Sequence, residues 1–576
     1  MKKKFIYLMA ILFVGISCGD EFSTTPAIGA LSDESLANPQ GVDLLLTGAY
    51  SMLDGWRENN NRGNQFAVSG DNWWCDVIAD DAHKGSTDGD QIELFQIETF
   101  DWQTANDYFR AKFTGLYAGV NRCNAALSVI NGIDRASLLP VDEASIIGQE
   151  AEARFLRGHY YFELTKLFGN VSIVSVENYD NLEFSQPNDG PAWEQIESDF
   201  QFAIDNLPAT RADQADPGRP TAVVARAYMG KAHLYQADWA NALTEFNAVI
   251  SSGEFSLSPE YLDNFNAAGE NGPESVFAIQ FAADAAQSFN GNRGGTLNFP
   301  GGGPFASCCG FYQPTIDLAN AFRVDGDGLP LFDAFNDDDF LNDYEIESDE
   351  PFTPDTTTPV DSRLDYTVGR RGIDFNGFGE HVGKEWIRAG FNDISGPYLP
   401  KKNVYQASEV GDNRGSGAWG QEHSGVNYNI IRYADVLLMA AEAAVEAGDL
   451  ATALNYVNQV RNRAANTSVV QAIDGSGPAA NYQVGLYTSF PDVGFARDAV
   501  RFERRVELAM EGHRLFDLRR WGIAQTVITE YIANETRTIG NFGPKVNGYQ
   551  PQFDLLPIPL TSIDLSNGTL QQNPGY

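Results

Sequence analysis

The apolar positions along the chain follow a helical period over long stretches, and this period predicts a mostly α-helical protein. Residues 105–131 and 146–169 are expected to form a pair of helices, and residues 191–206 a further one. Within the second stretch, four apolar side chains are spaced by four, four and three positions, as one buried helix face requires: Leu156, Tyr160, Leu164 and Leu167.

Two other stretches, residues 221–250 and 432–463, each predict two helices joined by a tight turn. In the first, Gly230, Ala242 and Phe246 have the spacing of a tetratricopeptide repeat, where small residues let two helices approach closely. In the second, small residues recur at the same separation of twelve: Ala441 and Ala453. Several such hairpins together predict a tetratricopeptide-like scaffold of stacked helical hairpins.

The pattern changes between about residues 255 and 427. Clusters of Gly, Pro, Asn and Asp interrupt short apolar stretches such as Val276–Phe281, and acidic residues run together at 337–339. We therefore expect a loop-rich insertion with short strands, between scaffold segments of about 30–254 and 428–576. Loops held on a rigid scaffold often contain binding residues.

Composition and charge narrow the possible functions. The 576 residues are 43% hydrophobic and 20% charged, which is typical of a folded protein with a large core. Asp and Glu total 78 against 39 Lys and Arg, a formal net charge of −39. Such a charge repels phosphates, so it argues against a nucleic acid partner, and it favours neutral ligands over acidic ones.

The N-terminus has the features of an export signal. Three lysines precede the apolar run Phe5–Ile16, which is too short to span a bilayer. Small residues lead to Cys18, and Gly19–Glu21 resembles the acidic surface-export signal of some bacterial lipoproteins. We predict a signal peptide over residues 1–17 and lipidation of Cys18, which would attach the protein to a membrane. An ordinary signal peptide with an incidental cysteine is the alternative.

No convincing catalytic motif is present. The chain lacks HExxH, GxSxG and GxxxxGK[ST]. Asp325–Gly328 has no glutamate where a calcium loop would need one, so a surface turn is the better interpretation. We predict no catalytic residue, no metal site and no cofactor. A carboxylate pair hidden among 78 acidic residues would still leave a glycoside hydrolase open.

A series of short segments extends from one end of the chain to the other: Asp80–Ser86, Gly89–Gln91, Glu152–Arg157, Tyr160–Phe162, Phe168–Gly169, Glu274–Phe277, Asp361–Arg370, Glu503–Trp521, Leu555–Pro559 and Gln572–Tyr576. In this order they resemble the SusD/RagB family of surface glycan-binding lipoproteins. The resemblance implies a mostly helical, tetratricopeptide-like fold that covers a SusC-like TonB-dependent transporter at the outer membrane.

The resemblance also implies a function. Family members bind oligosaccharides outside the cell without cutting them, and a minority of the RagB type handle peptides. We therefore predict non-catalytic glycan binding and delivery to the transporter, with peptide binding as the first alternative. Three glutamates four apart in the helix expected at Glu503–Trp521 stand among arginines, and we interpret them as an ion-paired helix surface: Glu503, Glu507 and Glu511.

A glycan site needs aromatic rings, because a ring buries the C–H face of a sugar while polar groups orient the hydroxyls. The resemblance places such a platform on early loops and on loops of the centre. The fitting residues are Trp73 and Trp74 with Phe305, Phe311 and Tyr312 of the Gly-rich segment 291–313. Trp73 is the weaker of the two tryptophans, and both could be core residues. Trp419, in a Gly-rich run, is a further candidate.

Four cysteines remain after Cys18, and none has CxxC spacing. Cys308 and Cys309 could bond to each other, or one of them could bond to Cys75 and join the two candidate platform segments. Free buried thiols are the third possibility, also for Cys123, because cysteine is commonly buried unpaired.

Overall fold

The structure, a computed structural model, describes most of the chain: residues 33–55, 64–283, 291–305, 308–402, 404–416 and 422–576. The predicted signal peptide, Cys18 and Trp419 lie outside these residues. The fold is mostly helical with short paired strands, as predicted.

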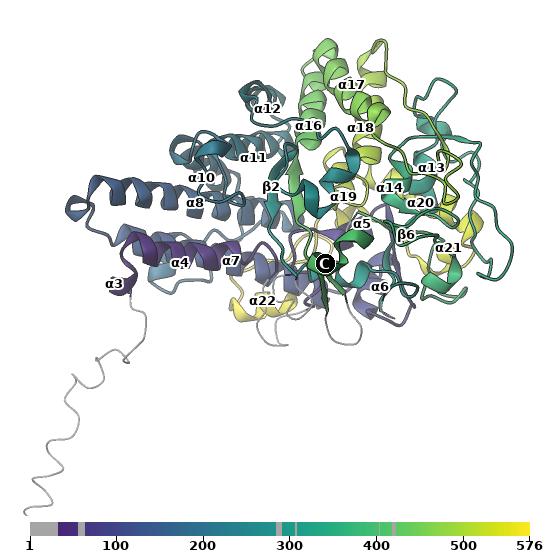
Figure 1. Ribbon diagram of the computed structural model, residues 1–576. Coiled ribbons are helices and arrows are strands. Elements are labelled where there is room, and N and C mark those ends of the chain that lie inside the picture. Colours follow the sequence, from purple (N-terminus) through teal and green to yellow (C-terminus); the bar gives the residue numbers. More distant parts are fainter. Residues whose placement is uncertain (1–32, 56–63, 284–290, 306–307, 403, 417–421) are drawn as a thin grey trace, which may run out of the picture.

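Long helices form one side of the molecule (Figure 1). α7 (Asp107–Asn131) and α8 (Pro140–Phe168) form the predicted pair, α4 (Pro39–Tyr50) packs on both, and α10 (Trp193–Asn206) packs on α8. The four residues that predicted the buried face of α8 are at most 1% exposed. α8 begins before residue 146 because Pro140 occupies its first turn, where a fixed φ favours the helix and the missing N–H has no partner to lose.

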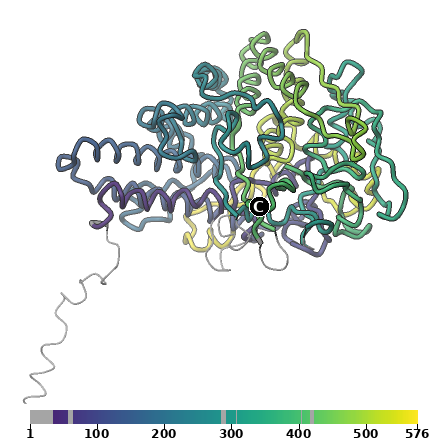
Figure 2. The backbone as a smooth tube through the Cα atoms, viewed as in Figure 1, coloured from purple at the N-terminus to yellow at the C-terminus, as the bar shows by residue number. Residues whose placement is uncertain are grey.

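Two helical hairpins extend this side. α11 (Ala222–Tyr235) packs on α12 (Trp239–Ser252), α16 (Tyr433–Glu446) packs on α17 (Leu450–Asn466), and α12 contacts α16. Figure 2 shows the two hairpins side by side although they are far apart in the sequence. A Cβ on Gly230 would lie 2.7 Å from a ring carbon of Phe246, so this close approach requires glycine. The predicted tetratricopeptide-like packing is confirmed.

The loop-rich region (residues 255–427) contains short strands and short helices. β2 (Ser275–Ile279), close to the predicted strand at Val276–Phe281, pairs antiparallel with β9 (Tyr428–Arg432) and so joins the start of this region to its end. The other pairs are β1 (Ala82–Gly85) with β3 (Phe311–Pro314), β4 (Pro359–Val360) with β10 (Asn481–Tyr482), β5 (Val368–Gly369) with β6 (Leu399–Pro400), and β7 (Arg414–Ser416) with β8 (Glu422–Ser424).

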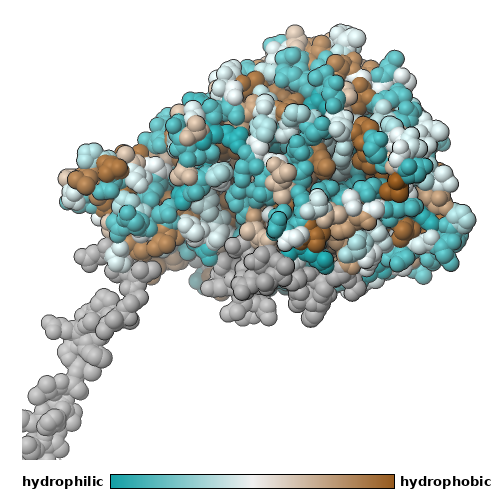
Figure 3. Space-filling model, viewed as in Figure 1, coloured by the Kyte–Doolittle hydropathy of each residue, from teal (hydrophilic) through white to brown (hydrophobic). Residues whose placement is uncertain are grey.

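The remaining α-helices are short, apart from α18 (Val493–Leu508) and α20 (Ala524–Thr538). The short ones are α3 (Asp33–Leu36), α5 (Trp73–Asp76), α6 (Ile92–Glu98), α9 (Val176–Asp180), α13 (Ile316–Ala321), α14 (Leu364–Thr367), α15 (Val410–Asn413), α19 (Arg514–Arg520), α21 (Phe542–Lys545) and α22 (Leu560–Leu565). The visible face is largely hydrophilic, with scattered apolar patches (Figure 3).

The single helix predicted at Glu503–Trp521 is wrong, because the chain forms two helices there. α18 ends at Leu508 and α19 begins at Arg514, with Met510 at φ 61° and Gly512 at φ 72° between them. A Cβ on Gly512 would lie 2.3 Å from the carbonyl oxygen of Asp71. The turn therefore needs glycine both for its positive φ and for this close backbone contact.

The predicted ion-paired helix surface is also wrong in its location. Glu503 and Glu507 are 0% exposed and Glu511 is 3% exposed, so these carboxylates lie in the interior. Their cationic partners come from other segments and not from the same helix: Arg363, Lys402, Arg432, Arg461 and Arg463. We call the three glutamates, Glu274 and these partners the glutamate cluster. Buried charges need such compensation.

Candidate functional site

The five aromatic residues expected to form a platform are all buried. Trp73, Phe311 and Tyr312 are 0% exposed, Trp74 is 1% and Phe305 is 6%. The structure does bring the early and central segments together, since the Trp73 and Tyr312 rings meet edge to face at 5.5 Å. They meet inside the core, where no ring face is open to a ligand.

The polar atoms of these rings are also occupied internally. The Trp73 indole donates to the Phe66 carbonyl at 3.0 Å, and the Trp74 indole donates to the Ala67 carbonyl at 3.2 Å. The Tyr312 hydroxyl bonds Asp76 at 2.6 Å. Trp74 is covered because its segment is the single-turn helix α5 and not a strand, and this turn lies against α7 residues Tyr108 and Phe109. In this conformation the alternative that both tryptophans are core residues holds.

A different surface lies where β1 and β3 end. β1 pairs with β3 so that Gly85 stands opposite Phe311, and the Ser86 N–H donates to the Gly310 carbonyl at 2.7 Å. Gly85 has φ 74°, and a Cβ there would lie 2.5 Å from that same carbonyl oxygen. Glycine at this position therefore holds the loop after β1 directly against the segment that contains Cys308 and Cys309.

The Lys84 side chain holds the loop after β1 through hydrogen bonds to its backbone. Its buried ammonium donates to the carbonyls of Gly85, Thr87 and Asp90, at 2.8, 2.8 and 3.0 Å, and lies 4.9 Å from the centre of the Phe311 ring. Burial lowers the pKa of Lys84 to about 8, partly offset by the carboxylates around it. Phe311 is therefore a buried residue that packs under the Lys84 ammonium.

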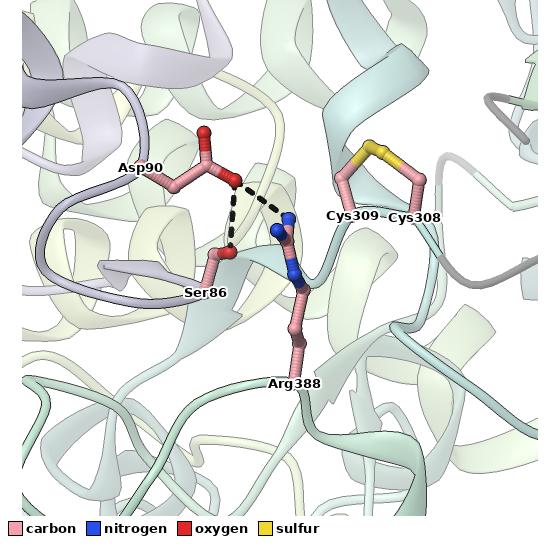
Figure 4. The surroundings of a disulfide bond; sticks show 5 residues. All are labelled: Ser86, Asp90, Cys308, Cys309 and Arg388. Atoms are coloured by element: carbon pink, nitrogen blue, oxygen red, sulfur yellow. Dashed lines mark hydrogen bonds and ion pairs between the residues drawn. A yellow bond between two sulfur atoms is a disulfide. The ribbon is translucent and has the colours of Figure 1, made fainter. Parts of the chain in front are cut away.

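Arg388 and Asp90 are the polar groups that this arrangement presents outward. The Arg388 guanidinium donates to the Asp90 carboxylate at 2.6 Å, and the Ser86 hydroxyl donates to the same oxygen at 3.4 Å. Figure 4 shows the three side chains together, with the Cys308–Cys309 disulfide close to Arg388. The side chains of Arg388 and Asp90 are 38% and 30% exposed. We call Asp90, Cys308 and Arg388 the Arg388 surface.

Glycines of the central loop pack against the chain beneath this surface. The Gly301 N–H donates to the Trp386 carbonyl at 2.9 Å, and a Cβ on Gly301 would lie 2.6 Å from the Cβ of Arg388. Gly303, at φ 70°, lies so close to the Trp386 indole that a Cβ would be 2.3 Å from its ring. The Gly-rich composition therefore serves close packing around Arg388.

The cysteines follow the first of the three alternatives. Cys308 and Cys309 form a disulfide with each other, whereas Cys75 and Cys123 are free and buried. The proposed link from Cys75 to the central loop is therefore wrong. Cys309 lies in the core, and Cys308, the member of the pair in the Arg388 surface, is half-buried.

The Arg388 surface presents a cationic donor and a carboxylate acceptor, and the buried Ser86 hydroxyl orients the carboxylate from the interior. Such a set suits a ligand with many hydroxyl groups. Across the residues described, no cluster of three or more His, Cys, Asp or Glu side chains could hold a metal ion. In the same residues, none of the helices has the length and apolar character to cross a bilayer.

Comparison with known proteins identifies the class. The model of the SusD family matches residues 273–576, and a second model, described as starch-binding associating with outer membrane, matches residues 51–234. The chain belongs to the SusD family. This agrees with the order of segments in the sequence and with the helical-hairpin fold.

Individual relatives match most or all of the chain. SusD-like protein P2 of Formosa agariphila is 25% identical over 596 residues, which is 100% of both chains. A SusD-like protein of Bacteroides ovatus is 25% identical over 74% of this chain and 68% of its own. Surface glycan-binding protein A from Bacteroides thetaiotaomicron, solved with laminarihexaose, is similar in fold, with a TM-score of 0.65 and 20% identity over 93% of this chain and 99% of its own.

Sequence reasoning missed the Arg388 surface. Asp90 belongs to the Gly89–Gln91 segment that resembles the family, and this was the only available signal. Nothing in the sequence singled out Arg388, because the contact that makes it notable joins residues almost three hundred positions apart.

Proposed function

We propose that this protein binds extracellular glycan and delivers it, uncut, to a SusC-like TonB-dependent transporter. The observation that most supports this is its membership of the SusD family, together with similarity to SusD-like proteins over the full chain. A SusD-fold protein solved with laminarihexaose agrees with a glycan as ligand. In this proposal residues 18–576 form one SusD-like domain, and residues 255–427 are an insertion in its helical scaffold.

The Arg388 surface is the proposed glycan site. Its charged groups lie in an exposed pair, so they can exchange partners with sugar hydroxyls without leaving a buried charge. The net charge of −39 favours a neutral glycan. Because the five candidate rings are buried, we do not include them in the site.

Calorimetry with neutral hexasaccharides tests this site. Arg388→Ala should weaken binding about tenfold or more, since a hydrogen bond to a charged group is worth roughly 1.5–3 kcal/mol. Arg226→Ala is the matched control, because Arg226 is also 38% exposed and pairs with Glu245 at 2.9 Å on the helical hairpins. Equal affinities of the two variants would exclude Arg388 from the site.

The same screen separates the competing functions. Heat released with peptides but with none of the glycans would favour the RagB-type alternative. New reducing ends after incubation with polysaccharides would identify a hydrolase and contradict the non-catalytic proposal.

We also propose that lipidated Cys18 anchors the protein at the cell surface. The match to a model described as associating with the outer membrane supports this location, and the flanking sequence of Cys18 fits lipoprotein processing. Cys18→Ala should release the protein from the outer-membrane fraction or block its maturation. Unchanged attachment in fractionated cells would contradict the anchor.

A further inference from the structure

A hollow lies between α18, α20 with the turn before it, and residues 332–337. Its volume is about 690 Å³, within the usual range for small-ligand sites. It shares no residue with the Arg388 surface. We call it the Arg501 cavity. Its floor is a satisfied ion cluster in which Arg505 and Arg514 bind the buried carboxylates of Asp80, Asp81 and Asp317.

One wall of the Arg501 cavity is aromatic. Phe332 and Phe335 each meet Phe502 edge to face, with ring centres 5.7 and 5.6 Å apart. All three rings are half-buried, unlike the five rings near the Arg388 surface. Apolar ring surface that remains accessible inside a hollow is the feature that a sugar C–H face needs.

Arg501 lines this cavity, and no hydrogen bond or ion pair joins it to another described residue. Its guanidinium is 4.9 Å from the Trp521 ring centre, and its buried Nε has no hydrogen bond. Throughout the described ranges it forms no ion pair, whereas the nearby Arg520 bonds both Glu442 and Asp517. The Nε is closed to a ligand, but the two Nη atoms are not buried and bond no described residue, so a ligand oxygen there would find an unpaired charged donor.

The rim of the cavity supplies acceptors. Four carboxylates line it and form no ion pair with any residue that the structure describes: Asp333, Asp337, Asp498 and Glu530. The excess of unpaired carboxylates over unpaired arginine disfavours an acidic ligand. The unpaired donor at Arg501 needs an oxygen, which a simple cation does not offer.

We propose that the Arg501 cavity is a second glycan-binding site, which holds neutral saccharide units through the Phe332–Phe335–Phe502 wall, Arg501 and the rim carboxylates. A hydroxyl group both donates and accepts, so one neutral ligand satisfies the arginine and the carboxylates together. The ligand class rests on the proposed function, but the location does not. With two sites on one chain, a polysaccharide could be held at two points, which increases avidity.

Two tryptophans report on the two sites separately. Trp521 contacts Arg501, and Trp386 lies beneath the glycines that pack around Arg388. The full mature chain labelled with 5-fluorotryptophan would show both by fluorine NMR, with each resonance assigned by a Trp→Phe variant. The probes are maltohexaose, laminarihexaose, cellohexaose, xylohexaose and mannohexaose, with a uronate oligomer and a lysine-rich peptide for comparison.

We expect a neutral hexasaccharide to shift the Trp521 resonance. Arg501→Met and Phe335→Ala should each weaken that response at least tenfold and leave the Trp386 response unchanged, and Arg388→Ala should do the reverse. Melting curves confirm that each variant is folded. Arg501→Met keeps the apolar stem over Trp521, so it remains informative if Phe335→Ala unfolds.

The outcomes separate this inference from the proposed function. A shift of Trp386 alone, or a Trp521 shift that only Arg388→Ala removes, would overturn the second site and leave the proposed function intact. A Trp521 response only to the uronate oligomer or to the peptide would overturn the ligand class. No shift and no heat with any glycan would overturn both proposals.

Discussion

The helical hairpins and the loop-rich region are ordered by different interactions. In the hairpins, small residues lie against rings, as Gly230 lies against Phe246, and the Arg226–Glu245 ion pair is partly exposed. In the loop-rich region, Arg363 is 0% exposed and bonds Asp361, Glu503 and Glu507. The hairpins do contain a buried pair, Lys231–Asp435, but their order follows mainly from apolar periodicity. Several buried charges hold the second region in place, and they include arginines of α17 and glutamates of α18.

The difference matters because apolar packing and buried ionic networks respond differently to substitutions. Apolar packing tolerates substitutions that conserve volume. A buried ionic network does not, since removal of one member leaves an opposite charge without compensation in a medium of low dielectric constant. The loop-rich region should therefore be stable as long as the glutamate cluster is complete, and sensitive to any change in it.

The largest effect is expected for Glu507→Gln, which removes one charge and almost no volume. Glu507 binds Arg363 at 2.7 Å and also pairs with Arg432 and Arg463. Burial alone would raise the pKa of Glu507, but the three guanidinium groups hold it well below its usual range. Breaking such a site should lower the free energy of unfolding by about 3–5 kcal/mol in denaturant titrations.

Glu446→Gln is the control for Glu507→Gln. Glu446 bonds Arg497 at 2.7 Å, but the two side chains are 20% and 35% exposed. A partly exposed pair contributes about 1 kcal/mol or less. Similar losses in the two variants would contradict the idea that buried charges specify the second region.

The next effect concerns His83 of β1, which joins α6 and α20. His83 bonds Glu98 at 2.9 Å and Glu535 at 2.8 Å, and all three side chains are buried. Burial alone would lower the pKa of His83, but the bonds to Glu535 and Glu98 raise it to about 9. Because the folded pKa lies above the unfolded value of about 6.5, the stabilisation is complete below pH 6.5 and is lost as the pH rises through 9.

The expected contribution of His83 is up to about 3 kcal/mol, taking 1.36 kcal/mol for each pKa unit. It can be measured as the difference in unfolding free energy between the protein and His83→Gln at several pH values. That difference should shrink between pH 7 and pH 10. A constant difference over this range would mean that His83 is neutral in the folded protein.

The smallest effect tests the apolar region. Gly230→Ala places a methyl group 2.7 Å from the Phe246 ring and should lower stability by about 1–3 kcal/mol, because the packing cannot expand freely. Gly148→Ala in α8 meets nothing within 4 Å and should raise stability by about 0.5–1 kcal/mol through helix propensity. Melting curves that move in the same direction for both variants would argue against close helix packing at Gly230.

Much of the helical architecture could be predicted from the sequence, because each helix buries one apolar face that repeats along the chain. Residues 105–131, 221–250 and 432–463 all predicted helices that the structure contains. The break between α18 and α19 could not be predicted in this way. It depends on Gly512 fitting against the backbone of Asp71, which is a contact between distant segments.

The candidate site was less predictable for the same reason. Trp74 is chemically suited to sugar binding, but its burial depends on Tyr108 and Phe109 of α7. The Arg388 surface depends on a loop after β1, a disulfide before β3 and a segment near residue 388. Local patterns cannot reveal which polar residues from three such segments meet.

The β2–β9 pair has a consequence for how such a protein can diversify. Since Ile279 stands opposite Tyr428, the point where the chain leaves the helical scaffold and the point where it returns are adjacent. Lengthening a flexible connection between fixed ends is inexpensive, about 0.6 kcal/mol for each doubling. Loops of the region between these strands can therefore lengthen or shorten while the helices stay together, provided that Arg363, Lys402 and the strand pairs that hold the region are kept. New binding specificities would then arise from changes in these loops, while the helices and the anchoring contacts stay the same.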